Sequence, residues 1–224
     1  MKNKLSQLLP DYARLPLILV VIWNQSVYYG SRLLTTNRYH YNIELTIDRA
    51  IPFLPWTISI YFLCYLFWIA NYIICARQEK RLAYRFLCAD CLAKCVCLAC
   101  FLIFPTTNIR PAVEGGGIWN ELMRFLYQAD AADNLFPSIH CLVSWFCYIG
   151  IRGKRNIPLW YRCFSCLAAF AVFFSTLATK QHVIVDVIGG VALAEVCYLI
   201  TGHTAILEAY TRLMDRLQRI GSKG

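Results

Sequence analysis

Six long runs of apolar residues constrain what this chain can fold into. A membrane-spanning helix needs about 20 mostly apolar residues. Of the 224 residues, 58% are hydrophobic and only 16% are charged, whereas soluble domains carry about 25% charged residues. These values exclude a disordered chain and an ordinary soluble enzyme. We predict spans at residues 15–29, 51–76, 83–104, 138–151, 157–179 and 182–201.

The sequence therefore predicts an all-α fold, a six-helix transmembrane bundle formed by a single integral membrane domain over residues 1–224. Two further helices are expected outside the spans. Residues 118–127, in the third and longest connection, carry apolar side chains at helical spacing, which predicts a short surface helix near a lipid access path or packed on the protein. Residues 205–220 place apolar side chains opposite arginines, which predicts an interfacial helix touching anionic lipid.

The basic residues indicate how the bundle is oriented. Fifteen Lys and Arg residues fall at the termini and in the second and fourth connections, whereas six fall in the other connections. By the positive-inside rule, both termini are expected in the cytoplasm. The net charge of +9 therefore indicates membrane topology rather than a nucleic-acid partner, because no Lys/Arg-rich block stands on a soluble segment.

Twelve cysteines are present, and five of them cluster between residues 88 and 100. Two Cys-x2-Cys pairs there make a metal site conceivable, but the side chains would spread around a helix instead of converging as four ligands. We expect the cysteines to pack as small apolar residues. No disulfide framework is indicated, because the connections contain no cysteine.

Two of the four histidines stand where they can do chemistry, unlike His40 and His203, to which we assign no role. His140 opens the fourth predicted span and His182 opens the sixth, so both lie at the non-cytoplasmic end. Asp186 follows His182 by four residues and shares its helix face. A carboxylate there can accept the proton of one ring nitrogen and leave the other basic, as a nucleophile toward phosphorus requires. The alternative is an ion pair that only stabilises the helix end.

Candidate phosphate-binding groups lie at the same end of the bundle. Ser138 follows Pro137 at the start of the fourth predicted helix, where free backbone N–H groups attract anions. Arg110 lies just beyond the third span, and its planar guanidinium suits a phosphate group. Lys180 precedes His182 by two residues. Singly, each group is explained by a helix cap or a solvated cation; together they match phosphoryl transfer through a covalent histidine intermediate.

At these residues the sequence resembles the type 2 phosphatidic acid phosphatase superfamily of membrane enzymes, which is related to the vanadium haloperoxidases. The motifs of that family are Lys-x6-Arg-Pro, Pro-Ser-Gly-His and Ser-Arg-x5-His-x3-Asp. Three positions differ here, because Ile103 replaces the Lys, Ile139 the Gly and Thr176 the Arg. The resemblance covers residues 50–200. The motifs appear in this order as Arg110-Pro111, Pro137-Ser138-Ile139-His140 and Ser175-Thr176 followed by His182 and Asp186.

The resemblance implies a role for each matching residue within a catalytic core at residues 83–201. His182 would be the nucleophile, Asp186 its orienting carboxylate, and His140 the acid that protonates the leaving oxygen. We expect Lys180 to replace one missing family cation, because it lies close in sequence to the nucleophile. Cations and amides then supply the positive charge, so no metal and no cofactor are expected. Phosphate oxygens would be held by Arg110, Ser138 and Ser175.

The first interpretation is a membrane lipid phosphatase. It would hydrolyse a phosphate monoester of a phosphatidic acid-like, prenyl or sphingoid lipid through a phosphohistidine at the non-cytoplasmic face. The alternative is a head-group phosphotransferase similar to inositol-phosphoryl-ceramide or sphingomyelin synthases, because the acceptor, water or an alcohol, decides the outcome. A small transporter is an alternative of another class, although its site would lie near the bilayer midplane. The sequence indicates no oligomeric state.

Other polar and small residues within the spans have packing explanations. Asp90 and Lys94 stand four residues apart in the third span, with the acid first, and are expected to form a buried ion pair. A proton or ion path is the alternative. Gly189 and Gly190 are expected to permit close approach of the sixth helix to a neighbour.

Overall fold

A computed structural model describes residues 8–202 and 205–221 of the chain. His203 and the terminal Lys2, Lys4 and Lys223 lie outside these ranges. The described chain is almost entirely helical, which confirms the predicted all-α class. The elements are α2 (Asp11–Thr35), β1 (Tyr41–Asn42), α3 (Thr46–Ala50), η1 (Pro55–Thr57), α4 (Ile58–Ala76), α5 (Lys80–Ile103), β2 (Thr106–Thr107), α6 (Ile118–Ala129), α7 (Ile139–Ile149), α8 (Leu159–Ala178), α9 (Ile184–Gly202) and α10 (Ala205–Gly221).

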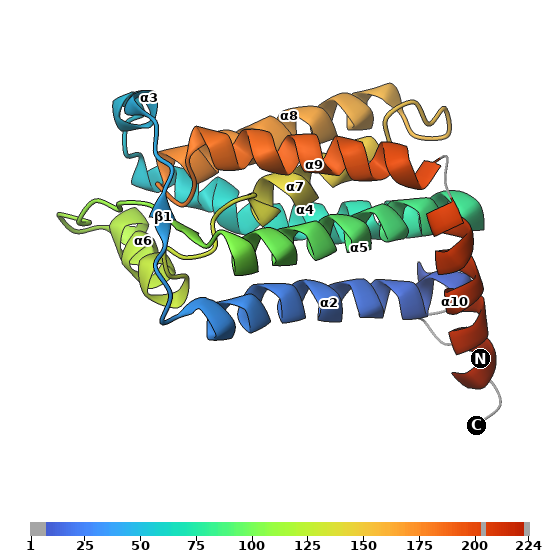
Figure 1. Cartoon of the computed structure of the whole chain (residues 1–224). Coiled ribbons are helices and arrows are strands. Elements are labelled where there is room, and N and C mark those ends of the chain that lie inside the picture. Colours follow the sequence, from blue (N-terminus) through green and yellow to red (C-terminus); the bar gives the residue numbers. More distant parts are fainter. Residues whose placement is uncertain (1–7, 203–204, 222–224) are drawn as a thin grey trace.

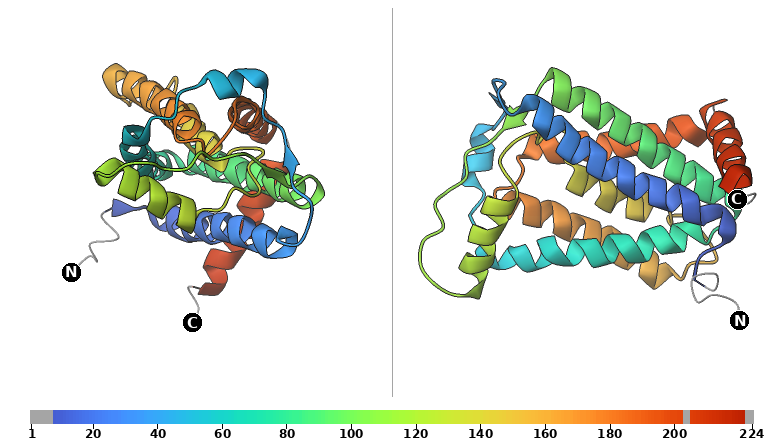
Figure 2. Two further views of the ribbon diagram at one scale, coloured as in Figure 1. Left: turned by 90° about the vertical axis from the view of Figure 1, so that its left-hand side faces the viewer. Right: turned by 90° about the horizontal axis from the view of Figure 1, so that it is seen from below.

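The body of the molecule is formed by helices that run alongside one another, namely α2, α4, α5, α7, α8 and α9 (Figure 1; Figure 2). Helix α10 crosses one end of this bundle, and α3, β1 and α6 lie at the other end. Helix α2 begins at the same end as α10. The two ends of the bundle therefore carry different elements, and the site described below is built near the end with α6.

Four of these helices are long and apolar enough to cross a membrane, within the part of the chain that the structure describes: Pro55–Ala76, Lys80–Ile103, Leu159–Ala178 and Ile184–Gly202. Each of the six predicted stretches contains a helix. However, α7 has 11 residues and at 1.5 Å per residue spans only about 16 Å, against a hydrocarbon core of about 30 Å. The count of six spans therefore stays a prediction.

Helix α5 lies within the bundle and carries a buried ion pair. Lys94 donates to Asp90, and both side chains are almost fully buried, as expected for a pair that keeps two charges in an apolar environment. The cysteines of α5 range from buried Cys88 and Cys97 to exposed Cys95, so they spread around the helix. Among the described residues, no three His, Cys, Asp or Glu side chains gather as metal ligands would.

The two helices expected outside the spans are both present. Helix α6 buries Met123 and Leu126 against Ile58 of α4, and α10 buries Leu207 and Met214 against α5. Each helix also leaves large apolar side chains exposed. Their placement along a membrane surface stays a prediction.

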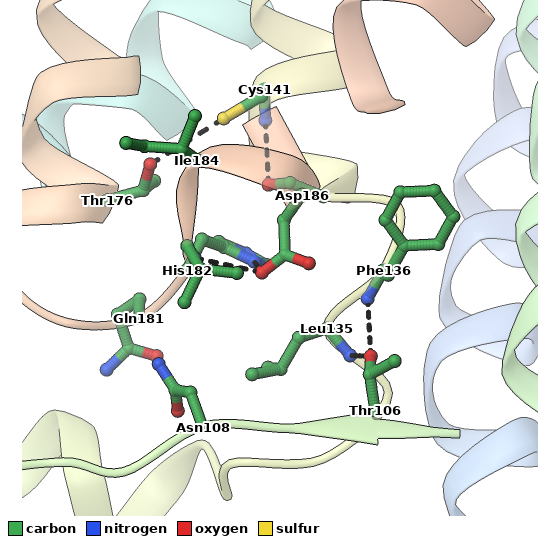
Figure 3. A network of polar contacts seen from close by, with 12 residues as sticks. Thr106, Asn108, Leu135, Phe136, Cys141, Thr176, Gln181, His182, Ile184 and Asp186 are labelled. Atoms are coloured by element: carbon green, nitrogen blue, oxygen red, sulfur yellow. Dashed lines mark hydrogen bonds and ion pairs between the residues drawn. The ribbon is translucent and has the colours of Figure 1, made fainter. Parts of the chain in front are cut away.

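A short parallel β pair fixes the segment that leads into α7. Strand β1 pairs with β2, and Tyr41 lies opposite Thr106. The Thr106 hydroxyl accepts hydrogen bonds from the backbone N–H of Leu135 at 3.0 Å and of Phe136 at 2.8 Å (Figure 3). Because Thr106 is fully buried, this contact holds the loop before α7 in one position.

Gly190 lets α9 approach the start of α7 closely. A Cβ atom at Gly190 would lie 2.6 Å from the carbonyl oxygen of Ser138, a backbone atom that cannot rotate away. We expect Gly190→Ala to destabilise the protein by about 1–3 kcal/mol, measured as a lower thermal unfolding midpoint in detergent. Gly30→Ala is the control, because nothing lies within 4 Å of a Cβ there. Equal midpoints for the two variants would contradict this packing.

Candidate active site

His182 and Asp186 form a pair at the start of α9. Nδ1 of His182 lies 3.2 Å from Oδ2 of Asp186, which also accepts the backbone N–H of Val183 at 3.0 Å (Figure 3). Asp186 is fully buried and His182 is 8% exposed. The helix begins at Ile184. His182 therefore lies just before α9, whereas the sequence predicts that it lies on the helix. The contact between His182 and Asp186 is the one in which a carboxylate can accept the proton of a ring nitrogen.

His140 faces the same site from the first turn of α7. Its ring centre lies 5.9 Å from that of His182 and 4.6 Å from that of Tyr61. Its Nε2 lies 3.4 Å from the Tyr65 hydroxyl. The backbone N–H of Ser138 donates to the carbonyl oxygen of Asp186 at 3.1 Å, which ties the start of α7 to α9. Two imidazoles 42 residues apart in sequence thus meet because these helix starts are joined directly.

Both histidines line one cavity of about 370 Å³. Its walls come from α2, α4, α5, α6, the loop before α7, the first turn of α7 and the turn before α9. Aromatic side chains dominate the lining, and Asp130 and Asp133 also line it. None of the described residues that line the cavity is Lys or Arg. Neither of the predicted cationic phosphate-binding groups, Arg110 and Lys180, lines this cavity.

The two predicted serines are used within the fold. The Ser138 hydroxyl caps α7 by accepting the backbone N–H of Cys141 at 3.2 Å, as favoured at a helix start. The Ser175 hydroxyl is fully buried and donates to the carbonyl oxygen of Thr57 at 2.7 Å. Neither side chain lines the cavity.

The Lys180 side chain points toward the segment between α3 and η1. Its ammonium donates to the carbonyl oxygens of Asp48 at 2.8 Å and Ile51 at 2.6 Å. Asn108 holds the same turn by donating to the carbonyl oxygen of Lys180 at 2.8 Å. Lys180 therefore does not line this cavity, although it and His182 both line a separate, smaller pocket.

Arg110 does not line the cavity but contacts Gln181, which does. Its Nη2 donates to Oε1 of Gln181 at 2.7 Å and to the carbonyl oxygen of Ala131 at 3.3 Å, and Nη1 donates to the carbonyl oxygen of Asp130. The guanidinium also lies 4.9 Å from the ring centre of Tyr127. Arg110 thus joins the loop before α7 to the turn that carries His182.

The loop between α6 and α7 carries the acidic side of the site. Asp133 pairs with Arg32 of α2 at 3.0 Å. Burial raises the pKa of Asp133 above its usual value, and the nearby Arg32 guanidinium opposes this shift. Burial likewise raises the pKa of Tyr127 to about 12, with Arg110 opposing. The tyrosine is therefore a neutral hydroxyl at physiological pH.

Comparison with known families identifies the family of this chain. The family model described as the PAP2 superfamily matches residues 38–200, more than half of the chain. The chain belongs to the PAP2 superfamily. This confirms the resemblance inferred from the motifs, and the PAP2 superfamily consists of phosphatases and related phosphotransferases. The chain matches no curated protein and no solved structure at a significant level.

Two positions that are cationic in the PAP2 motifs carry no charge here. Ile103, at the end of α5, is exposed. Thr176 is fully buried, and its carbonyl oxygen accepts the backbone N–H of Gln181 at 2.9 Å and of His182 at 3.1 Å. Thr176 therefore shapes the turn that presents His182 in this PAP2 protein.

Sequence reasoning missed Gln181. It is 1% exposed and lines the cavity beside His182. Arg110 occupies its Oε1, whereas its Nε2 has no hydrogen-bond partner among the described residues. A buried N–H group without a partner is costly, and a phosphate oxygen in the cavity would supply one. The sequence offered only its position directly before His182, since glutamine is otherwise ordinary in a turn.

We expect Gln181→Glu to lower kcat/KM by roughly 10²-fold or more, because a carboxylate keeps the acceptor for Arg110 but removes the N–H donor and repels phosphate. Turnover of the preferred lipid by purified protein in detergent micelles measures this. Gln128→Glu is the control, because it makes the same substitution at an exposed position of α6. Wild-type kcat/KM in Gln181→Glu would show that the amide does not contact the substrate.

Proposed function

We propose that this protein is an integral membrane enzyme that transfers the phosphorus group of a lipid phosphate ester through a phosphohistidine on His182. One observation carries the proposal: the rings of His140 and His182 lie 5.9 Å apart on one cavity, with Asp186 behind His182. A phosphorus centre between them would meet a nucleophile and a proton donor. Membership in the PAP2 superfamily supports this reaction class.

The proposed reaction has two steps. In the first, Nε2 of His182 attacks phosphorus, the bond from phosphorus to the lipid oxygen breaks, and His140 gives a proton to that oxygen. Asp186 stabilises the charge that the His182 ring gains. In the second, His140 takes a proton from water or an alcohol, whose oxygen bonds to phosphorus as the bond to His182 breaks. The enzyme is thereby returned to its starting state.

We also propose the placement in the membrane. The start of α9, with His182 just before it, lies toward the end of the bundle opposite α10 (Figure 1). The excess of basic residues at the termini supports a multi-pass protein with both termini in the cytoplasm and the site at the non-cytoplasmic face. That face is outside the plasma membrane in a bacterium and lumenal in a eukaryote.

The first candidate reaction is hydrolysis of a lipid phosphate monoester. Purified protein would be incubated with phosphatidic acid, a prenyl phosphate and a sphingoid phosphate, first in water and then with ceramide or diacylglycerol. Release of free phosphate supports hydrolysis, and a new phospholipid supports transfer. Equal product from wild type and His182→Ala would contradict the proposed function.

The second candidate is transfer of a phosphorylated head group from a lipid diester. The absence of Lys and Arg among the described residues that line the cavity favours it. A phosphate monoester carries about −1.5 to −2 charge at pH 7, whereas a diester carries a single negative charge. A cavity without cations suits the diester better.

A further inference from the structure

The charged side chains that line the cavity are acidic. Asp130 and Asp133 both line it. Arg32 pairs with Asp133 at 3.0 Å, but Asp130 has no ion pair among the described residues. The hydroxyls of Tyr28 and Tyr61 donate to its two carboxylate oxygens. Asp130 therefore places a carboxylate that two tyrosine hydroxyls hold, and that forms no ion pair among the described residues, beside the cavity.

The same cavity is walled by aromatic rings. Tyr28 and Tyr29 of α2 meet edge to face with ring centres 5.0 Å apart, and Tyr65 and Trp68 of α4 do the same at 5.0 Å. All four line the cavity. Faces of Tyr and Trp rings attract organic cations, most strongly when the cation is removed from water. Rings and a carboxylate together form the recognition chemistry of a quaternary or primary ammonium group.

An apolar groove adjoins this cavity. It has a volume of about 450 Å³ and lies between α2 and α4. Asn24, Gln25, Tyr65 and Trp68 line both the groove and the cavity, so the two are neighbours. The remaining groove residues are mainly aliphatic, and the one charged side chain among those described, Lys94, is paired with Asp90. This groove has the chemistry of an acyl-chain path beside the cavity.

From these observations, and resting on the proposed function, we infer that the substrate is a zwitterionic phospholipid whose ammonium head group binds at Asp130 and the tyrosine and tryptophan rings. The acyl chain follows the groove between α2 and α4. His182 attacks phosphorus and the bond to the glycerol oxygen breaks, so that diacylglycerol leaves with a proton from His140. The head-group phosphate stays on His182 until water or an alcohol takes it, returning a proton to His140.

A comparison of lipids tests the inference. Wild-type protein is given micelles that contain phosphatidylcholine, phosphatidylinositol or phosphatidic acid, and the rate of diacylglycerol release is measured. We expect phosphatidylcholine to react at least on the order of tenfold faster than the other two. Faster release from phosphatidic acid or phosphatidylinositol would overturn the inference, although turnover that depends on His182 would leave the proposed function standing.

A variant separates recognition from folding. Asp130→Asn should lower the ratio of the phosphatidylcholine rate to the phosphatidic acid rate on the order of tenfold. A purely structural role would lower both rates together and leave the ratio unchanged, which would contradict the inference. Asp215→Asn is the control. Asp215 lies on α10, at the opposite end of the bundle, where it pairs with Lys80.

A binding measurement covers the case in which Asp130→Asn does not fold. Labelled phosphocholine and labelled inorganic phosphate are dialysed against His182→Ala protein, which keeps the cavity but lacks the proposed nucleophile. We expect phosphocholine to bind at least on the order of tenfold tighter than phosphate. Equal or tighter binding of phosphate would overturn the inference, and the result does not depend on any turnover.

Discussion

Replacing His182 by alanine should reduce turnover of the preferred lipid by more than about a thousandfold, because the group that bonds to phosphorus is removed. Asp186→Asn should cost about 10²–10⁴-fold, because the amide can turn His182 into the wrong tautomer while the ring remains. Lipid turnover by protein in detergent, at matched folded concentration, measures both losses.

His40→Ala is the matched control for this series. His40 lies in the connection before β1, where its Nδ1 contacts the carbonyl oxygen of Arg38, and it does not line the cavity. We expect it to keep wild-type turnover. If His182→Ala retained comparable activity, another residue would have to be the nucleophile.

Replacing His140 by alanine should slow lipid turnover by about 10²–10⁴-fold, the range for a general acid and base. The loss should depend on the leaving group. A nitrophenolate leaves without a proton, so His140→Ala should still form the intermediate from a nitrophenyl phosphate ester. Breakdown of the intermediate still needs a base, and labelled enzyme should therefore accumulate.

The comparison of the two substrates checks this assignment. Single-turnover assays with the lipid and with the nitrophenyl ester give the rate of the first step for each. Equal losses on both, or no accumulation of labelled enzyme, would show that His140 does not transfer the proton.

The helices and the contact between His182 and Asp186 could be predicted because they rest on local patterns. Apolar runs of fixed length mark the helices, and the four-residue spacing of His182 and Asp186 predicts their contact. The cap at Ser138 follows from its place after Pro137. Counting the spans predicts that His140 and His182 lie at the same end of the bundle. Their ring centres are 5.9 Å apart in the structure.

The direction of individual side chains could not be predicted. Lys180 is two residues from His182, yet its ammonium is held by carbonyl oxygens of residues 48 and 51, which are remote in sequence. The hydroxyl of Ser175 is likewise taken by Thr57. Gln181 gained its position through Arg110, 71 residues away. Such contacts depend on how α3, η1 and the loops pack, and no local spacing encodes them.

The extent of α7 was also beyond the sequence pattern. Residues 138–151 are mostly apolar, but the helix ends at Ile149. Most of its residues are buried. A short helix surrounded by others can be apolar without spanning a bilayer on its own, so composition does not fix its length.

The central claim is that His182 carries the phosphorus group during turnover. Wild-type protein is mixed with labelled lipid, quenched in alkali, which preserves phosphohistidine, and digested for mass spectrometry. We predict a modified peptide that contains His182, absent from His182→Ala protein and lost on treatment with acid. Modification of His140 or of a serine instead, or turnover with no modified peptide at any time, would contradict the account.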